Sequence, residues 1–254
     1  MTTIASLVRG TVLALAATAM TAGAGMAQDV LKIGSTPSGI PFTFLDVKTN
    51  QIDGVMVDII KAIGEVEGFS PQIQATQFNA LLPSLTSGKI DVIAAAMYAT
   101  PERAKIVAFS EPVYSYGEGL FVKSDDKTDY KTLDDLAGKT AGVQVGTAYV
   151  APLQASDKLK EVKVYDTISD IMRDVAIGRI DAGFGDKPIV AYQLSQGASA
   201  KVRLVTDYDS QYVGNVAIAV RQDDPALLAK MNDGLKKIKD SGKLDESIKK
   251  WGIE

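Results

Sequence analysis

The chain has 254 residues, with 27 Lys and Arg against 31 Asp and Glu, a formal net charge of −4, and neither His nor Cys. Without imidazole or thiol groups it cannot build a Ser-His-Asp or Cys-His catalytic centre, the usual zinc site or a disulfide. Its mild acidity, with no block of Lys and Arg, argues against nucleic-acid binding, which needs clustered positive charge.

Residues 1–27 have the pattern of an export signal. Arg9 ends a short basic region, residues 11–20 are mostly apolar and small, and residues 24–27 supply the small side chains that a signal peptidase requires. The apolar run is shorter than the about 20 residues that a membrane-spanning helix needs. Because there is no Cys for a lipid anchor, we expect cleavage after Ala27 and a mature protein in the periplasm.

The first half of the remaining chain alternates short apolar strands with helices, which is typical of an α/β fold with mainly parallel sheets. Residues 90–96 are almost wholly apolar, as in a strand buried on both faces. The pattern predicts strands at residues 30–34, 90–96, 105–109 and 119–123, and helices at residues 54–63 and 79–87.

The second half continues this alternation. The spacing of Thr132 and Asp135 fits a capping box at the start of a short helix that Gly138 ends. The last helix is amphipathic, and Leu244, Ile248 and Trp251 extend its apolar face. The pattern predicts strands at residues 140–145, 180–184 and 215–220, and helices at residues 168–177, 188–196 and 225–241.

One short sequence pattern occurs twice. Residues 88–91 and 178–181 are both Gly-basic-Ile-Asp, and each lies between the end of a helix and a buried strand. Sheet packing alone explains each copy, since the Gly caps a helix and the Ile begins a core strand. The shared order of elements nevertheless favours two similar α/β lobes.

Three predicted strand ends carry polar groups, and ligands of open α/β sheets bind beyond the carboxyl ends of strands. Arg103 follows the first of these strands, in a helical turn capped by Thr100, where a cation opposes the helix dipole. Gly146 and Thr147 follow the second strand and offer backbone N–H groups and a hydroxyl to an anion. Asp186 follows the third.

Each of these groups also has a purely structural explanation. Arg103 could form a surface ion pair with Glu102 or Glu111, the turn at Thr147 is common, and Asp186 could cap a helix. Together, however, they would complement a zwitterion, with Arg103 and Thr147 holding a carboxylate and Asp186 an ammonium group. Because burying such charges costs several kcal/mol each, the site requires a ligand that supplies the counter-charges.

Several further segments carry a family resemblance: residues 41–44, 54–60, 78–91, 100–103, 108–112 and 178–181. In this order and spacing, the chain resembles the periplasmic solute-binding proteins of polar-amino-acid ABC transporters, solute-binding protein family 3, over residues 30–253. The resemblance implies a two-lobed periplasmic-binding-protein fold of type II, in which each lobe is a mainly parallel sheet flanked by helices and two strands form the hinge. Lobe 1 would comprise residues 28–116 and 213–254, and lobe 2 residues 117–212.

The resemblance also implies roles for individual residues. Arg103 would bind an α-carboxylate and Asp186 an α-ammonium group. The other implied ligand contacts are a backbone carbonyl at Ala96, carboxylate contacts from Thr147 and Ala148, a pocket wall at Phe78, and recognition of the ligand side chain at Gln144.

At some positions the chain departs from the family pattern. Tyr98 replaces the usual Ser or Thr, and Gly39 stands where many members have a stacking aromatic residue, so we expect Tyr98 to provide the aromatic wall. Thr36 stands where an acid is frequent, which disfavours a cationic ligand side chain. Glu118 is a candidate compensating acid, although hinge solvation is its expected role, and Tyr116, like Tyr114, is expected to pack in the hinge.

The sequence therefore predicts a non-enzymatic substrate-binding component of an ABC importer, which captures an amino acid or an amino-acid-like zwitterion by hinge closure. We expect no cofactor, no metal and no nucleic acid, a membrane permease as partner, and a monomer. The alternatives are a periplasmic cyclohexadienyl (prephenate or arogenate) dehydratase, for which Glu118 and Asp186 are the candidate acids, and a soluble ligand sensor. The identity of the amino acid stays open.

Overall fold

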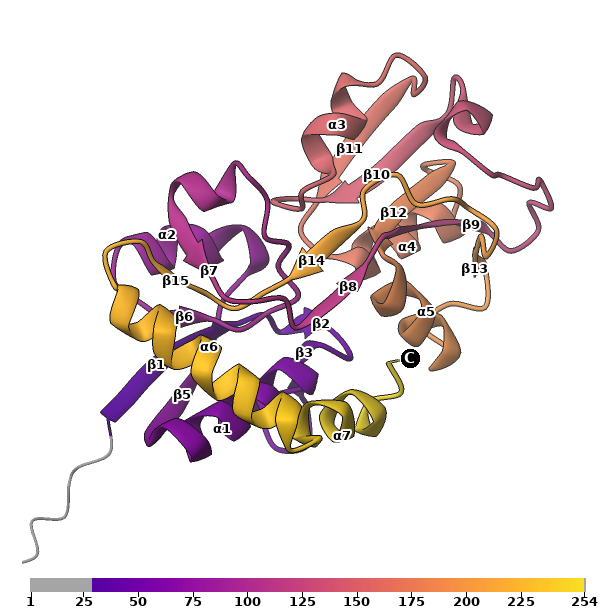
Figure 1. Ribbon diagram of the computed structural model, residues 1–254. Coiled ribbons are helices and arrows are strands. Elements are labelled where there is room, and N and C mark those ends of the chain that lie inside the picture. Colours follow the sequence, from indigo (N-terminus) through magenta and orange to yellow (C-terminus); the bar gives the residue numbers. More distant parts are fainter. Residues whose placement is uncertain (1–28, 254) are drawn as a thin grey trace, which may run out of the picture.

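The computed structural model describes residues 29–253, so the predicted export signal lies outside the described residues. Two five-stranded sheets dominate the molecule (Figure 1). In the first sheet β5, β1 and β6 are parallel, whereas β15 runs antiparallel to both of its neighbours. Its strands are, in spatial order, β5 (Phe69–Ala75), β1 (Asp29–Ser35), β6 (Val92–Ile93), β15 (Ala219–Arg221) and β7 (Val107–Phe109).

The second sheet has the same plan. Its first three strands are parallel, and the fourth is antiparallel to both neighbours. The α/β fold with two similar lobes is confirmed, but both sheets are mixed because in each a returning strand pairs antiparallel with the parallel set. The order is β11 (Glu161–Tyr165), β10 (Thr140–Gln144), β12 (Ala182–Asp186), β9 (Glu118–Lys123) and β13 (Val202–Leu204).

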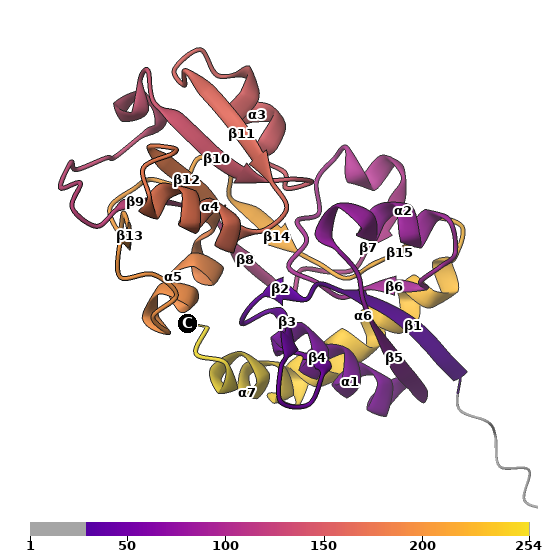
Figure 2. The same cartoon turned by 180° about the vertical axis from the view of Figure 1, so that it is seen from behind.

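Two antiparallel strands, β8 (Tyr114–Tyr116) and β14 (Gly214–Val216), connect the two sheets. They cross side by side between the lobes in both views (Figures 1 and 2). These are the hinge strands, one leading out of lobe 1 and the other leading back. The lobe boundaries at residues 116/117 and 212/213 stay a prediction.

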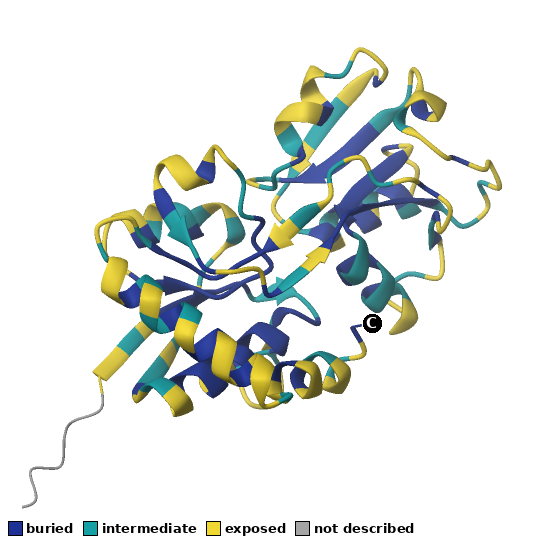
Figure 3. Ribbon diagram, in the orientation of Figure 1, coloured by how far each residue is buried: buried dark blue, intermediate teal, exposed yellow. Residues whose placement is uncertain are grey.

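Helices cover both faces of each sheet, so the central strands are buried on both sides (Figure 3). In β6, Val92 packs into one hydrophobic cluster and Ile93 into another, as predicted for this apolar segment. Lobe 1 carries α1 (Val55–Glu67), α6 (Pro225–Asp240) and α7 (Lys243–Lys250) on one face and α2 (Leu81–Thr86) on the other. Lobe 2 carries α4 (Ile168–Ala176) and α5 (Lys187–Ser195) on one face and α3 (Val150–Ala155) on the other.

The repeated Gly-basic-Ile-Asp pattern occupies equivalent positions in the two lobes. The Asp91 carboxylate accepts the N–H of Lys32 at 3.0 Å, and the Asp181 carboxylate accepts the N–H of Thr140 at 2.8 Å. Each aspartate also donates its own N–H to the carbonyl of the same partner. Both copies therefore join the third strand of their sheet to the second, and their role is structural.

Several elements differ from the sequence prediction. The strand expected at residues 215–220 is divided into β14 and β15, because the backbone N–H of Ile218 leaves the strand pattern and bonds the Ser110 hydroxyl. The strand expected at residues 90–96 is regular only at Val92–Ile93. The pattern missed β5, β11, β13 and a small sheet of β2 (Ser38–Gly39), β3 (Thr43–Asp46) and β4 (Gln51–Asp53).

Short helices also refine the prediction. The capping box is confirmed, since Thr132 and Asp135 bond reciprocally at the start of η3 (Leu133–Leu136), a 3-10 helix. The helix expected at residues 79–87 begins as η1 (Phe78–Ala80), a second 3-10 helix, before α2. The helical turn expected at Arg103 is η2 (Arg103–Lys105), so β7 begins only at Val107.

Candidate ligand-binding site

Arg103 lies in η2, beyond the carboxyl end of β6, and is only 8% exposed. The Thr100 hydroxyl accepts its backbone N–H at 3.3 Å, as expected for a cap. Its guanidinium donates to the carbonyl of Tyr98 at 2.6 Å and to that of Gly146 at 2.7 Å. Because Gly146 follows β10 of lobe 2, the second bond joins the two lobes directly. Within residues 29–253 Arg103 forms no ion pair, so the alternative of a surface pair is wrong.

The ring of Phe78 lies beside this cation. The guanidinium carbon of Arg103 is 5.9 Å from the centre of the Phe78 ring, within the range of a cation–π contact. Burial lowers the pKa of Arg103, and the negative charge of Asp186 opposes that shift. Arginine stays protonated in proteins, so the site retains its positive charge.

Asp186 ends β12 in lobe 2 and is also 8% exposed. Its Oδ2 accepts the hydroxyl of Tyr116 at 3.0 Å, and its Oδ1 accepts the hydroxyl of Tyr149 at 3.2 Å. Although Asp186 stands at the N-cap position of α5, its side chain makes no capping bond. The helix-cap explanation of this residue is therefore wrong.

The pKa of Asp186 is raised to about 6, because burial penalises the charged carboxylate. The hydrogen bonds from Tyr116 and Tyr149 and the charge of Arg103 act in the opposite direction. The carboxylate is thus mostly ionised at pH 7 and becomes protonated in mild acid.

Tyr116 connects the two charged groups. It lies on hinge strand β8, its carbonyl accepts the hydroxyl of Tyr98 at 2.9 Å, and the two rings are 5.2 Å apart. Its own hydroxyl donates to Asp186 and lies 3.4 Å from the carbonyl of Ala96. The expectation that Tyr116 only packs in the hinge is therefore incomplete. Tyr149 was not predicted at all, since no motif marks it.

Tyr98 is fixed from several sides. It is 5% exposed, and a Cβ added at Gly214 of β14 would clash with its ring. The ring therefore packs tightly against the backbone of the second hinge strand. The Thr36 hydroxyl lies 2.6 Å from that of Thr43. That Tyr98 replaces the aromatic wall lost at Gly39 stays a prediction.

The turn after β10 brings lobe 2 to the guanidinium. Gly146 has a φ of 81°, and a Cβ there would lie 3.2 Å from the Cα of Asn79 in lobe 1, so glycine permits this close approach. Thr147 donates its hydroxyl to the carbonyl of Gln144 at 2.8 Å, and the Gln144 side-chain amide donates to the carbonyl of Asp166 at 3.0 Å. These bonds hold the turn together.

The predicted site residues thus gather in one region. Contacts run from Phe78 through Arg103 and Tyr98 to Tyr116 and Asp186. The Ala96 carbonyl lies beside the Tyr116 hydroxyl, and Gln144, Thr147 and Ala148 flank the Gly146 carbonyl that Arg103 binds. Direct contact of each with a ligand stays a prediction.

Glu118 has a different role from the one expected. It is fully buried, and its carboxylate accepts the backbone N–H groups of Gln211 and Tyr212, each at 2.8 Å. Its carbonyl accepts the Ser210 hydroxyl at 2.6 Å. The expectation of a solvated hinge acid is wrong, because Glu118 holds the segment that leads into the second hinge strand. Burial raises the pKa of Glu118, and the backbone N–H donors oppose that shift.

Two further features are absent from residues 29–253. No cluster of three or more Asp and Glu side chains in this part of the chain has the arrangement of a metal site. None of its helices combines the length and apolar character that crossing a membrane requires.

The chain matches known proteins over nearly its whole length. ABC transporter arginine-binding protein 1 of Escherichia coli (strain K12) is 34% identical over 243 residues, which cover 94% of this chain and 97% of that protein. Solved structures of an ancestral arginine-binding protein, one bound to arginine and one to glutamine, have TM-scores of 0.81 and 0.80 at 32% and 33% identity. Each of these two matches covers 89% of this chain and 99% of the other.

These relatives are named as binding proteins, which agrees with the prediction that the chain is not an enzyme. The family profile of the bacterial extracellular solute-binding proteins, family 3, matches residues 31–254. The protein therefore belongs to the bacterial extracellular solute-binding proteins, family 3.

Proposed function

We propose that the chain is the substrate-binding component of an ABC importer and captures an amino acid by closing its two lobes around it. One observation carries this proposal. Arg103 in lobe 1 and Asp186 in lobe 2 are buried opposite charges, and among the described residues neither forms an ion pair. Isolated buried charges are costly, and a zwitterion placed between them would supply both counter-charges.

In this proposal Arg103 and the turn at Thr147 and Ala148 bind the α-carboxylate. Asp186 and the Ala96 carbonyl bind the α-ammonium group. The hydroxyls of Tyr116 and Tyr149 hold the Asp186 carboxylate in place. The side chain therefore loses less conformational entropy when the ligand binds.

For the ligand side chain we propose an uncharged polar group, with glutamine preferred over arginine. The names of two relatives, the arginine-binding protein of Escherichia coli and the ancestral protein bound to arginine, point to a ligand with a cationic side chain. Here, however, the resemblance leads us to expect an acid at Thr36, whose hydroxyl instead contacts that of Thr43. The Glu118 carboxylate is occupied by backbone N–H groups. A guanidinium side chain would then lack a carboxylate partner.

Closure follows from binding to both lobes. A ligand shifts an equilibrium between open and closed forms only by its difference in affinity for the two. One zwitterion can contact Arg103 and Asp186 at the same time only when the lobes are close together, so it binds the closed form more tightly. The direct bond from Arg103 to the Gly146 carbonyl joins residues of the two proposed lobes, which is compatible with closure at this point.

The partner and location follow from the same assignment. We propose that the closed lobes dock on a membrane permease, that the protein is a monomer, and that it works in the periplasm after cleavage behind Ala27. The family name describes extracellular proteins, which supports export.

A ligand panel tests the proposal. Thermal unfolding in the presence of each standard amino acid should identify a ligand that stabilises the fold by RT ln(1 + [L]/Kd), followed by calorimetry on glutamine and arginine. We expect micromolar or tighter binding, which corresponds to about −8 kcal/mol. Failure of every α-amino acid to bind would overturn the proposed function.

The dehydratase alternative receives less support. Of its two candidate acids, Glu118 has its carboxylate fully buried in hydrogen bonds to the hinge segment. Asp186, which our proposal assigns to the ligand ammonium group, is then the only candidate that could serve as the acid. Incubation with prephenate or arogenate, followed by ultraviolet absorbance of the aromatic product, should show no conversion. Conversion that depends on Glu118 or Asp186 would replace our proposal.

A further inference from the structure

The Glu118 carboxylate is a buried charge that the proposed ligand contacts do not use. It forms no ion pair among the described residues, and its two oxygens accept the backbone N–H groups of Gln211 and Tyr212, each at 2.8 Å. Burying a carboxylate without a cation costs several kcal/mol. Its advantage over a side-chain amide is a second acceptor oxygen. A carboxylate in this place is therefore suited to holding two consecutive N–H groups at once.

The backbone beside Glu118 holds the same segment. The Glu118 carbonyl accepts the Ser210 hydroxyl at 2.6 Å, and a Cβ added at Gly117 would clash with Ser210. Each of residues 210–212 is thus bonded to, or packed against, residues 117–118. We call this set of contacts the hinge clasp.

The hinge clasp fixes the place where β14 begins. Gly214 follows Tyr212 by two residues and pairs with Tyr116 of β8 in the antiparallel register. The ring of Tyr98 packs on Gly214, and its hydroxyl donates to the Tyr116 carbonyl at 2.9 Å. Tyr116 is therefore held by β14 directly and also through Tyr98.

Asp186 is joined to the hinge clasp in two ways. Its backbone pairs with that of Glu118 across β12 and β9, and the N–H of the next residue, Lys187, donates to the Gly117 carbonyl at 3.1 Å. Its carboxylate accepts the Tyr116 hydroxyl at 3.0 Å. The backbone of Asp186 is thus fixed to the start of β9, and the position of its carboxylate depends on a tyrosine that β14 holds.

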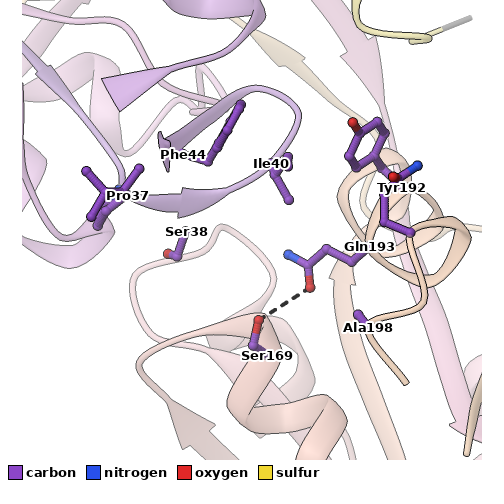
Figure 4. Close-up of a pocket in the computed structure, with 10 residues that line it drawn as sticks. Pro37, Ser38, Ile40, Phe44, Ser169, Tyr192, Gln193 and Ala198 are labelled. Carbon is purple, nitrogen blue, oxygen red and sulfur yellow. Dashed lines mark hydrogen bonds between the residues drawn. The ribbon is translucent and has the colours of Figure 1, made fainter. Parts of the chain in front are cut away.

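The lobes are not joined in this way at the face between β2, β3 and α4, α5. An open pocket separates these elements (Figure 4). Within residues 29–253 no hydrogen bond crosses the pocket, and the one drawn there, from the Ser169 hydroxyl to Gln193, lies within lobe 2. The position of Tyr116 relative to Asp186 therefore depends on the hinge and not on this face.

We propose that Glu118 is a positioning residue of the ligand site: the hinge clasp holds β14, and β14 keeps the Tyr116 hydroxyl on the Asp186 carboxylate. This inference rests on the proposed function, in which Asp186 receives the ligand ammonium group. Glu118 needs no contact with the ligand, because its effect reaches the site through Tyr116.

The pKa of Asp186 reports this effect in the ligand-free protein. The hydrogen bond from Tyr116 lowers that pKa, the charge of Glu118 raises it, and the bond has the larger influence. The other groups that face the carboxylate, Tyr149 and Arg103, lower its pKa and are not part of the hinge clasp. Loss of the Tyr116 bond and loss of the Glu118 charge therefore move the pKa of Asp186 in opposite directions.

Glu118→Gln tests the proposal by an NMR titration that follows the side-chain carboxyl carbon of Asp186. The amide keeps the size of the side chain but can accept only one of the two N–H groups, so the hinge clasp should loosen. We expect the pKa of Asp186 to rise. A fall in this pKa would mean that Glu118 acts through its charge alone, and either a fall or no change would overturn the proposal.

Asp126→Asn is the matched control. Asp126 holds a loop of lobe 2 by accepting the N–H of Thr128 at 2.9 Å and the hydroxyl of Tyr130 at 2.8 Å. This variant also replaces a carboxylate that holds backbone, but away from the hinge, and it should leave the pKa of Asp186 at its wild-type value.

Calorimetry with glutamine at pH 8, where Asp186 is mostly ionised, gives a second readout. Glu118→Gln should weaken binding about fivefold in the wild-type background, as expected for loss of one neutral hydrogen bond. In the Tyr116→Phe background the same substitution should weaken binding less than about twofold, because the contact through which it acts is already absent. An equal loss in both backgrounds would contradict a route through Tyr116.

Ser210→Ala keeps the proposal testable even where Glu118→Gln fails to fold. It removes one bond of the hinge clasp and leaves the charge of Glu118 in place, so we again expect a higher pKa of Asp186, with a loss of glutamine affinity of about twofold. An unchanged pKa in this variant would count against the proposal.

The two kinds of failure are distinguishable, since the NMR titration needs no ligand. A wild-type protein that binds no amino acid overturns the proposed function. A wild-type pKa of Asp186 in both Glu118→Gln and Ser210→Ala overturns this inference alone.

Discussion

The charged site and the hinge segment around Glu118 satisfy their buried charges in different ways. At the charged site, Arg103 and Asp186 are surrounded by carbonyls and hydroxyls that the chain itself supplies, and neither forms an ion pair among the described residues. At the hinge, the Glu118 carboxylate accepts two backbone N–H groups from the segment that leads into β14. Both arrangements satisfy hydrogen bonds, but only the charged site holds opposite charges on two lobes that a zwitterion can bridge. Changes at the charged site should accordingly have the larger effects on ligand binding.

The largest effect is expected from Arg103→Ala. It leaves the ligand carboxylate buried without its counter-charge, which typically costs about 3 kcal/mol, or roughly a 100-fold loss of affinity. Calorimetry with glutamine measures the loss. Arg179→Ala, at an exposed arginine paired with Asp174 in lobe 2, is the control and should keep wild-type affinity. Wild-type binding by Arg103→Ala would remove the basis of the proposed site.

Asp186→Asn should have the next largest effect. The amide retains the size and one acceptor but loses the negative charge, and a hydrogen bond to a charged group is worth about 2 kcal/mol. We expect a loss of glutamine affinity of about 30-fold, with little change in the thermal unfolding of the ligand-free protein. Retained tight binding would mean that another group receives the ammonium.

The affinity should also depend on pH. The pKa of Asp186 is raised to about 6 in the ligand-free protein, so the carboxylate loses its charge as the pH falls through that value. From pH 7 to pH 5 its ionised fraction falls about tenfold, and the affinity for an ammonium ligand should fall about as much. Asp186→Asn should show no such decline, and an equal decline in that variant would assign the dependence to another group.

A smaller effect is expected from Tyr149→Phe. It removes one neutral donor from the Asp186 carboxylate, worth about 1 kcal/mol, or roughly fivefold in affinity. Because this bond lowers the pKa of Asp186, its loss should also move the pH dependence to higher pH. Tyr165→Phe removes a comparable hydroxyl-to-Asp174 bond in lobe 2 and should leave both properties unchanged.

The charged residues could be predicted from the sequence, but their tyrosine partners could not. Arg103 and Asp186 stand at the ends of apolar strands, and the geometry of α/β sheets brings such ends together. Tyr116 and Tyr149 reach Asp186 across 70 and 37 residues of sequence, so no local pattern connects them. Glu118 was wrongly expected to be solvated for the same reason, since its partners follow more than 90 residues later.

The central strands of each sheet could be predicted from the sequence, whereas the edge strands could not. Central strands such as β9 and β10 are buried along most of their length and were predicted to within one residue at each end. The edge strands β5 and β11 were missed because one face of each meets solvent and polar residues interrupt the apolar pattern. An apolar sequence pattern thus reveals the central strands of each sheet. The edge strands are recognised only from their pairing with a neighbouring strand in the folded chain.

The central claim is that Arg103 recognises the α-carboxylate of an amino acid, and comparison of two ligands on two proteins tests it most directly. Calorimetry would compare glutamine with 4-aminobutanamide, which lacks only the carboxylate, on the wild type and on Arg103→Ala. We predict that the wild type prefers glutamine by about 100-fold and that Arg103→Ala binds the two nearly equally. A variant that keeps the full preference for glutamine would contradict the account.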